Sequence, residues 1–423
     1  MNFNKCVSKE LRKFNYQLCT IQPSSLLRRR DIFIKMEREL INFKISAPGR
    51  IVLSGEHLAM YERHFVVAGL DLRTKLEFCE LPETERIIRI EFSRVDLQCA
   101  IPLAIVESYF FHPTVSTIKT NPVEFLKYVK FFIDQARMWN TCEQRFSLQI
   151  FFYLLCFMTN NLERRPFHVR VSTEIPFGSG LGSSTSFAGC LAACFLHWER
   201  RQKSYHIAFN NWELDEIEQY AKSCENVMQD NIIASIDAKI CLRGGIKKCR
   251  RTNYQSHFTE TIDFVSGLRI LLINTNISQN KEQRAQQMVN LRCKNLIDFF
   301  SLLYILDAIA KNIWDKLNVI RNNSVDSPSC QDLYRQLENE IRRNQLLLKY
   351  NNLSDPKVDE VCSFAKNFKL NGKLTGFQGG YVYILLPPML TDEKIEYIKA
   401  QFLEQYPNCI STTFDYDGVR IDQ

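Results

Sequence analysis

The sequence predicts an α/β protein with two domains and two-layer α+β packing. Its 423 residues are enough for two domains that each bury a core of their own. Strand-like segments rich in β-branched residues lie near both ends of the chain, and long segments with helical periodicity lie between them. Near the middle, a strand-like segment leads through a glycine-rich turn into a helical segment.

Composition and charge limit the partners that this chain can have. Hydrophobic residues make up 45% of the chain and charged residues 24%, which is typical of a globular protein in water. The net charge is +7, but residues 1–35 hold eight basic and two acidic side chains, so +6 of this charge lies there. The remaining chain therefore has no general surface for polyanions, and we expect no nucleic-acid partner.

The sequence also argues against a membrane or secreted protein. The longest apolar runs, Phe146–Met158 and Phe299–Ala310, contain polar residues and are shorter than the roughly 18 uncharged residues of a spanning helix. The N-terminus has no apolar segment followed by a small-residue cleavage site. The 15 cysteines are scattered and form no C-x-x-C pair, which argues against zinc sites and disulfides. We expect them to be reduced residues of the core. We expect a cytoplasmic protein with no membrane partner.

The first half of the chain predicts an extension, then strands, then helices. Residues 1–40 are expected to form a basic, disordered extension because they show no clear apolar period, and a mitochondrial-type presequence is the alternative. Apolar and β-branched segments predict strands at 42–46, 51–53, 66–70, 74–78 and 87–92. Helical periodicity predicts helices at 103–111, 122–139 and 146–158.

The second half predicts long helices followed by a return to strands. Helices are expected at 212–228, 288–317 and 332–351. Strands are expected at 270–274, 373–375, 381–386 and 412–416. The polar residues 253–257 predict a connector, which divides the chain into an N-terminal domain at 41–255 and a C-terminal domain at 268–423.

The glycine-rich turn Pro176–Thr185 has the strongest functional signal. It joins the strand-like His168–Thr173 to the helical Phe187–Phe195, and its three glycines in five positions allow the backbone to approach a ligand closely. Ser183 or Ser184 is expected to cap the helix, whose first N–H groups and dipole favour an anion. The turn thus indicates a phosphate site, with an ordinary capped turn as the alternative. It matches neither the Walker nor the dinucleotide-binding pattern.

Two carboxylates near this turn suit phosphoryl transfer. Glu225 ends the helix 212–228, and Asp237 follows 12 residues later in an otherwise apolar segment. One carboxylate is suited to bind Mg²⁺, and the other to orient or deprotonate an attacking hydroxyl, with a solvated surface group as the alternative for each. A buried Asp237 needs a cationic partner, for which Arg50 is the candidate. His57 is a further candidate, with a structural histidine as the alternative.

Near the C-terminus, Gly372–Tyr381 is a second glycine-rich turn between strands. A plain hairpin is the alternative for this segment alone. Two distant glycine-rich turns, a basic turn and two carboxylates nevertheless agree on one chemistry, the transfer of a phosphoryl group.

These segments resemble the three signature motifs of the GHMP kinase superfamily, and most closely those of its mevalonate kinase branch. The motifs occur in the family order, and the resemblance covers the chain from about residue 42 to 420. They are Ser46–His57, Pro176–Ser184, and Lys373–Gly376 with Gly379 and Gly380. In addition, Leu70–Thr74 and Leu272–Thr275 are similar to segments that mevalonate kinases have at these places.

The resemblance implies a two-domain kinase fold with the active site in the cleft between the domains. It implies ATP-dependent phosphorylation of mevalonate to 5-phosphomevalonate in isoprenoid and sterol precursor synthesis, with Mg²⁺ bound to the co-substrate ATP and a possible homodimer. One alternative is another small-molecule kinase of the superfamily, such as a galactokinase-like enzyme. The other is a catalytically degenerate protein that binds a nucleotide without turnover.

The resemblance also implies roles for individual residues. Asp237 corresponds to the catalytic carboxylate, and Arg50 stands where the family has a lysine. Glu56 and His57 belong to the substrate end of the cleft. The ATP phosphates are expected to bind the loop residues Gly178, Ser179, Gly180, Leu181, Gly182, Ser183 and Ser184, with Thr173 as a further ATP contact. The ligands expected for Mg²⁺ are Ser184 and Glu225.

Several positions depart from the family pattern. Arg50 keeps the positive charge of the family lysine but replaces a compact ammonium by a planar fork. The run 232–235 before Asp237 lacks the proline and glycine that the family has there, and Phe377 and Gln378 replace small residues. Gln279 also stands where mevalonate kinases have an arginine, and Lys281 where they have a threonine. These departures leave the predicted fold unchanged and bear on rate and substrate.

Overall fold

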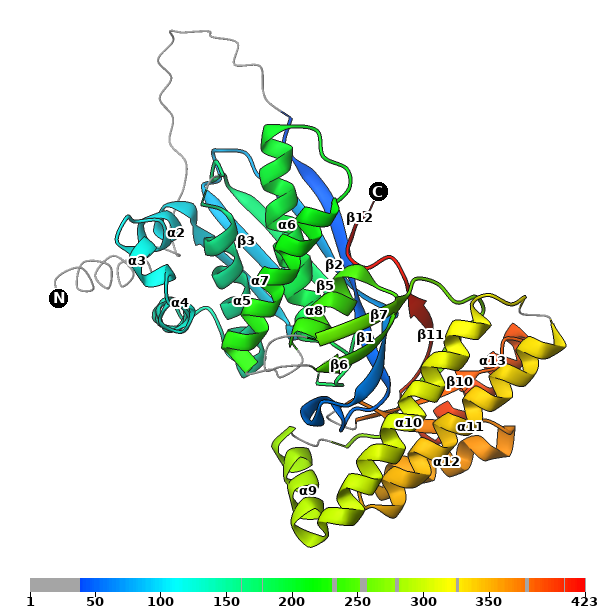
Figure 1. Cartoon of the computed structure of the whole chain (residues 1–423). Coiled ribbons are helices and arrows are strands. Elements are labelled where there is room, and N and C mark those ends of the chain that lie inside the picture. The colour runs from blue at the N-terminus through cyan, green and yellow to red at the C-terminus, as the bar shows by residue number, and fades with distance from the viewer. Residues whose placement is uncertain are drawn as a thin grey trace, which may run out of the picture.

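The computed structural model describes residues 39–160, 162–176, 178–229, 234–251, 257–277, 281–324, 327–376, 380–406 and 408–422. The predicted extension at residues 1–40 therefore lies almost entirely outside the described residues. In the described ranges the chain has a mixed α/β fold, in which strands form one large curled sheet and helices pack on it (Figure 1). This confirms the predicted α/β class.

The strands combine antiparallel neighbours with one parallel pair, β3 with β5. The order along the main path of the sheet is β4-β3-β5-β2-β11-β8-β10-β9. The strands are β1 (Asn42–Ser54), β2 (His64–Glu80), β3 (Ile87–Phe92), β4 (Leu97–Pro102), β5 (Phe167–Thr173), β6 (Ile246–Arg251), β7 (His257–Ile262), β8 (Arg269–Asn274), β9 (Gly372–Thr375), β10 (Tyr381–Leu386), β11 (Cys409–Asp415) and β12 (Arg420–Asp422).

The helices form two groups, one between β4 and β6 and one between β8 and β11. The first group is α2 (Leu103–Phe110), α3 (Val115–Lys119), α4 (Pro122–Ala136), α5 (Cys142–Met158), α6 (Ser183–Lys203), α7 (Asn211–Gln229) and α8 (Ala234–Arg243). The second is α9 (Lys281–Lys294), α10 (Leu296–Ile320), α11 (Pro328–Tyr350), α12 (Pro356–Ala365) and α13 (Asp392–Gln405). Short 3₁₀ turns are η1 (Ala59–Tyr61), η2 (Ser93–Val95) and η3 (Lys366–Phe368).

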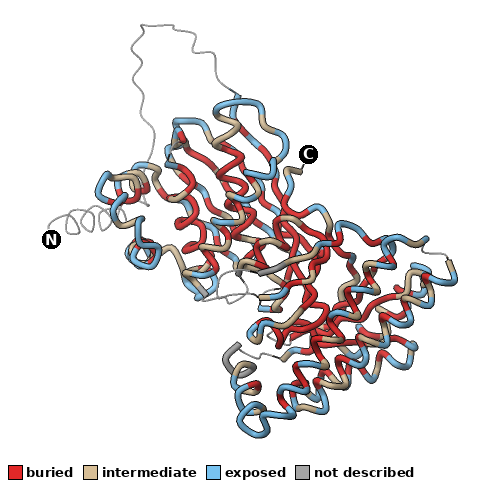
Figure 2. The backbone as a smooth tube through the Cα atoms, in the orientation of Figure 1, coloured by how far each residue is buried: buried red, intermediate tan, exposed pale blue. Residues whose placement is uncertain are grey.

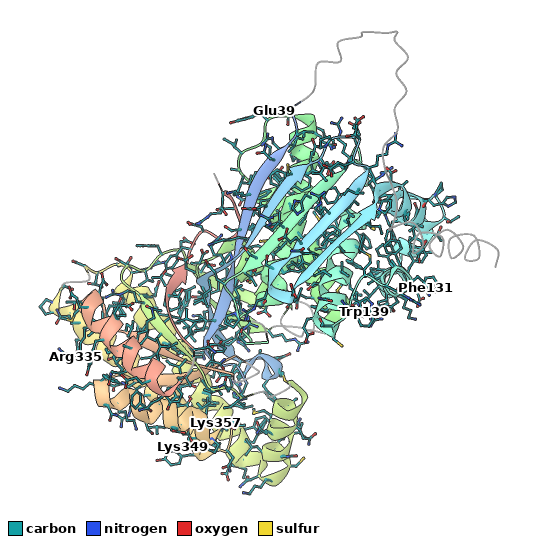
Figure 3. The ribbon with its side chains drawn as sticks, turned by 180° about the vertical axis from the view of Figure 1, so that it is seen from behind. Glu39, Phe131, Trp139, Arg335, Lys349 and Lys357 are labelled. Carbon is teal, nitrogen blue, oxygen red and sulfur yellow. The ribbon has the colours of Figure 1, made fainter. Side chains whose placement is uncertain are left out.

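The N-terminal half buries its core between the sheet and its first group of helices. Figure 1 shows α5, α6, α7 and α8 over one face of the sheet, and Figure 3 shows the same half from behind. Residues 147–156 of α5 and 188–198 of α6 are all buried, and the residues that fill the core are mainly phenylalanine and aliphatic side chains of α4, α5, α6, β2, β3 and β5 (Figure 2). This packing anchors the glycine-rich turn, because β5 precedes the turn and α6 follows it.

The C-terminal half packs its helices on β8, β9, β10 and β11. One core cluster joins α10 and α11 to β8, β10, β11, β1 and β2, and another, which includes Leu374 of β9, lies under α12 and α13. The chain then returns to the first half, where β12 pairs with β1 and the end of β11 pairs with β2. The division at 255–268 stays a prediction, and residues 252–256 lie outside the described ranges.

Two early strand pairs were predicted where the structure has single long strands. The segments 42–46 and 51–53 belong to β1, and 66–70 and 74–78 belong to β2. The proline and glycine at 48–49 produce a register shift between β1 and β2 rather than a turn. A Cβ on Gly49 would lie 2.8 Å from the carbonyl oxygen of Leu181, so glycine lets the strand approach the later loop.

The predicted range 288–317 is helical but divided in two, because α9 ends at Lys294 and α10 begins at Leu296. The break falls at Asn295, whose side chain accepts hydrogen bonds from the N–H groups of Ile297 and Asp298. Asparagine is among the best N-capping residues, and this cap starts a second helix inside a continuous apolar pattern. In the described ranges, no helix has both the length and the hydropathy that a membrane crossing requires.

Candidate active site

The glycine-rich loop has the conformation that its sequence predicts. Gly178, Gly180 and Gly182 have φ values of +66°, +72° and +82°, which side chains with a Cβ rarely adopt. A Cβ on Gly178 would meet no atom within 4 Å, so the backbone is open to a ligand there. The Ser179 hydroxyl closes the loop, donating to the carbonyl oxygen of Pro176 and accepting from the Leu181 N–H.

The predicted serine cap of the following helix is wrong. Gly182 is the N-cap of α6, with no side-chain hydrogen bond at the cap, and Ser183 and Ser184 are the first two residues of the helix. A φ of +82° at the cap favours glycine and leaves no capping side chain over the first turn. The N–H groups that start α6, together with the positive end of the helix dipole, are thus directed at the loop.

Arg50 and Asp237 form a bidentate ion pair at the centre of the candidate site. Arg50 Nε lies 2.6 Å from Asp237 Oδ1, and Nη2 lies 3.0 Å from Oδ2. The two residues are only 6% and 2% exposed. Burial acts to lower the pKa of Arg50, but the Asp237 charge and hydrogen bonds outweigh it and raise that pKa. The structure therefore brings together the predicted carboxylate and its predicted cationic partner.

The same arginine binds the glycine-rich loop. Its Nη1 donates to the carbonyl oxygen of Gly180, and its backbone N–H donates to that of Leu181 at 2.8 Å. On the other side, a Cβ added to Gly182 would lie 2.9 Å from Arg50 Cγ. The ion pair and the loop therefore form one packed unit, which links β1, the loop and α8.

Glu225 and Ser184 are the two residues predicted to bind Mg²⁺. Glu225 lies on α7 and is 3% exposed, and its charge contributes to the raised pKa of Arg50. Ser184 is half-buried in the first turn of α6, which packs against α7. The described residues contain no group of three or more histidine, cysteine, aspartate or glutamate side chains that could hold a metal alone. One carboxylate and one hydroxyl instead fit Mg²⁺, which takes oxygen ligands and usually keeps waters and substrate phosphates as further ligands.

Cys241 is a neighbour of the pair that the sequence did not suggest. Its Sγ lies 3.4 Å from the position of a Cβ on Gly182. Burial and the charges of Asp237 and Glu225 raise the pKa of the thiol well above its usual value, although Arg50 opposes this. The thiol is therefore protonated at neutral pH and acts as a small apolar group.

Thr173 lies at the end of β5, where the strand enters the loop. Its hydroxyl is 3.0 Å from the Thr74 hydroxyl and accepts a hydrogen bond from the Ile175 N–H at 3.2 Å. The structure thus gives Thr173 a role in the turn geometry, and its predicted contact with ATP stays a prediction.

The second glycine-rich turn lies against the first. Gly376 follows β9 with a φ of +73°, and a Cβ there would lie 3.1 Å from the carbonyl oxygen of Gly180. Two segments almost 200 residues apart in sequence therefore meet at the candidate phosphate site. Phe377 and Gln378 lie outside the described residues, as does the run 232–233 before Asp237.

Glu56 and His57 lie in a tight turn after β1. Gly55 has a φ of +85° and packs so closely on Phe65 that a Cβ would lie 2.7 Å from it. Both side chains are buried, and His57 Nδ1 is 3.8 Å from Glu56 Oε1. The carboxylate of Glu56 is held by Lys373 of β9, at 2.8 Å from each oxygen.

The pairing of Lys373 with Glu56 was missed at the sequence level, although a signal for it exists. Lys373 lies in a short strand-like segment whose other residues are apolar or small, so burial of its charge was foreseeable. The sequence offers many acidic side chains as partners, however, and only the fold brings Glu56 to it.

Comparison with known proteins supports the resemblance. The model of the GHMP kinases N terminal domain matches residues 150–245, a range that contains the glycine-rich loop, Glu225 and Asp237. The mevalonate kinase of Homo sapiens is 25% identical over 389 residues, which are 89% of this chain and 94% of the relative.

Solved structures agree with this similarity at the level of the fold. A crystal structure of mevalonate kinase matches with a TM-score of 0.63 at 17% identity, over 88% of this chain and 98% of that one. The L. major mevalonate kinase in complex with R-mevalonate matches with a TM-score of 0.62 at 15% identity, over 88% and 95% of the two chains. The predicted motifs, the matched domain and the shared fold agree: residues 150–245 match the N-terminal domain of the GHMP kinases, and over most of its length the chain is similar to mevalonate kinases as a divergent relative.

Proposed function

We propose that this kinase transfers the γ-phosphoryl group of ATP to the C5 hydroxyl of mevalonate and forms 5-phosphomevalonate. The observation that carries the proposal is the buried Arg50–Asp237 pair, which is bound to the phosphate loop through Gly180. It combines a carboxylate for the attacking hydroxyl with a cation for the transferred group at one place. The similarity to mevalonate kinases over most of the chain supports mevalonate as the acceptor.

Catalysis in this site rests on positioning and charge. The free N–H groups at the start of α6 bind the phosphates of ATP. Asp237 orients the acceptor hydroxyl and takes its proton, and Arg50 offsets the negative charge of the transferred phosphoryl group. Both carboxylate oxygens bind the guanidinium, so the orientation of Asp237 is fixed. This arrangement suits a loose transition state, in which the hydroxyl proton leaves late.

We assign the Mg²⁺ that accompanies ATP to Ser184 and Glu225. Their hydroxyl and carboxylate oxygens are the ligand types that this ion prefers. When bound, the ion neutralises charge on the phosphate oxygens.

We place the acceptor at the Glu56–His57 turn, which follows the strand β1 that carries Arg50. The L. major relative, whose structure contains R-mevalonate, shares the fold and supports an acceptor of this kind. The proposed reaction belongs to isoprenoid and sterol precursor synthesis in the cytoplasm. A homodimer stays a prediction.

The test is ADP release by the purified protein with Mg-ATP, measured with mevalonate, galactose, homoserine and phosphomevalonate in turn. Turnover with mevalonate alone is the expected result. Turnover with another acceptor instead would reassign the substrate within the superfamily. If the protein released no ADP with any of the four acceptors, although its melting temperature rose with ATP, nucleotide binding without turnover would replace the proposal.

A further inference from the structure

The ion pair between Lys373 and Glu56 is a buried charged contact outside the catalytic pair. Lys373 is 0% exposed and Glu56 is 1% exposed. Lys373 Nζ donates to both Glu56 oxygens at 2.8 Å and to the carbonyl oxygen of Leu374 at 2.7 Å. Three acceptors thus surround an ammonium that has three N–H donors. This geometry holds the carboxylate in place.

The electrostatics of this pair favour the charged form of Glu56. Burial acts to raise the pKa of Glu56, but the charges of Lys373 and His57 outweigh it, so that this pKa is lowered. Glu56 is therefore ionised at neutral pH inside the protein. A buried ion pair is weak as a general source of stability, because desolvation of both groups opposes the attraction. We therefore look for the role of this ion pair in the segments that it connects rather than in its contribution to stability.

The pair is the last in a series of contacts that hold the end of β1 from the C-terminal half. Side chains of β9, β10 and α11 bind successive residues of β1, so the strand end is fixed from one direction. The contacts run from Thr375 to the carbonyl oxygen of Val52 at 2.9 Å, from Tyr383 to that of Leu53 at 2.6 Å, and from Asn344 to the Ser54 hydroxyl at 2.9 Å. Lys373 extends the series beyond the strand into the turn that carries Glu56 and His57.

The strand β9 and the residue after it therefore contact both the turn of Glu56 and His57, where we place the acceptor, and the phosphate loop. Lys373 of the strand binds Glu56 in this turn, which we call the acceptor turn (Gly55–His57). Gly376, just after the strand, packs on Gly180 of the phosphate loop. The two residues are three positions apart, about 10 Å of extended chain. The buried strand β9 therefore connects the turn of Glu56 and His57 to the phosphate loop over this distance.

We propose that Lys373 is a positioning residue, which acts through Glu56 to fix the acceptor turn relative to the phosphate loop. The proposal rests on the proposed function for the identity of the acceptor side. The Lys373 side chain binds the acceptor turn, whereas only the backbone of Gly376 reaches the ATP loop. Loss of the lysine side chain should therefore affect the use of the acceptor and not the binding of ATP. Errors of about 1 Å in the position of a reactant cost about a hundredfold in rate, so the effect is measurable.

The test compares Lys373→Met, Glu56→Gln and the double variant with the wild type. Lys357→Met is the matched control, because Lys357 is an exposed lysine on α12 of the same half (Figure 3). In Lys373→Met we expect the KM for mevalonate to rise and kcat to fall, each about tenfold, with the KM for ATP within twofold of the wild type. The double variant should be no worse than Lys373→Met, since both changes break one contact. An unchanged KM for mevalonate, or equal rises for both substrates, would overturn the proposal.

Hydrogen exchange of residues 53–58 separates this proposal from the proposed function. Faster exchange there in Glu56→Gln and in Lys373→Met, with unchanged exchange of residues 178–184, is the expected result. A wild-type enzyme that turns over no mevalonate would refute the proposed function, while the exchange data would still decide the role of Lys373. Exchange that is unchanged at 53–58, or raised throughout the chain, would refute that role. If Lys373→Met does not fold, Glu56→Gln, which keeps the shape of the side chain, provides the same measurements.

Discussion

Replacing Asp237 by asparagine tests the charge of this side chain while keeping its shape. In the wild type, Arg50 donates to both carboxylate oxygens, at 2.6 and 3.0 Å. Asparagine keeps one acceptor oxygen and presents an NH₂ group where the second oxygen was, so one of the two charged hydrogen bonds is lost. Arg50 also keeps its bond to Gly180, so the loop stays attached to the arginine.

The expected loss of stability is moderate. One hydrogen bond between charged groups contributes about 1.5–3 kcal/mol, and we expect the free energy of unfolding to fall by about that amount. Deleting one partner of a buried pair altogether costs about 3–5 kcal/mol, so asparagine should be milder than alanine. A domain of ordinary stability tolerates such a loss, and Asp237→Asn should fold. Urea denaturation measures the difference.

The expected loss of turnover is larger than the loss of stability. A positioned base contributes about 10²–10⁴ in rate, which corresponds to roughly 3–5 kcal/mol of barrier. We expect kcat for ADP release with mevalonate to fall by at least a hundredfold, while ATP binding to the loop persists. A kcat within threefold of the wild type would refute the role of Asp237 in the reaction.

Asp134 provides the matched control for this experiment. It forms a similar bidentate pair with Arg145, at 2.9 and 2.7 Å, and also accepts from the Trp139 indole. This pair lies on the surface of the N-terminal half, and Asp134→Asn should leave kcat unchanged. Equal losses of activity in the two variants would show that the loss of any such pair, rather than the chemistry at Asp237, lowers the rate.

Three further predictions concern other parts of the structure. Gly182→Ala should lower the free energy of unfolding by about 1–2 kcal/mol, because φ at this residue is +82°. It should also lower kcat, because the added Cβ would lie 2.9 Å from Arg50 Cγ and displace the arginine. Normal kinetics would contradict the close packing of loop and arginine. Burial, together with the charge of His206, lowers the pKa of His197 to about 3, so the folded protein keeps this side chain neutral while the unfolded chain binds a proton below pH 6.5. The free energy of unfolding should therefore fall by about 2 kcal/mol between pH 6.5 and pH 5, and His197→Phe should lose this dependence in denaturation curves at the two pH values. In Lys373→Met, burial should raise the pKa of Glu56 above 4.5, so that the variant loses stability as the pH rises through that pKa. In the wild type the pKa of Glu56 is lowered, so that stability falls as the pH drops. A melting temperature of the variant that changes with pH as in the wild type would contradict the ion pair.

Local sequence was sufficient for the parts of the site that depend on backbone conformation. The glycines at 178, 180 and 182 adopt positive φ because no Cβ opposes it, and this property belongs to the residues themselves. The helix 212–228 appears as α7 with nearly the predicted bounds, because its apolar period is regular. The burial of Asp237 within an apolar segment was likewise predictable from its neighbours.

Errors arose where a local rule competed with packing. The proline and glycine at 48–49 are typical of a turn, yet β1 runs through them because its pairing with β2 continues on both sides. A serine is a better cap than glycine in general, yet Gly182 caps α6 because the chain enters the helix with positive φ. In both places the approach of the loop to β1 decided the conformation.

The sequence by itself determined the fold class, the order of the three motifs and the residue types of the site, since these follow from composition, periodicity and short-range conformation. Only the tertiary structure decided which charges meet. Arg50 and Asp237 are 187 residues apart, and Glu56 and Lys373 are 317 apart. Each charge had many possible partners along the chain, and the energy of a buried pair depends on distance and desolvation, which only the packed fold determines.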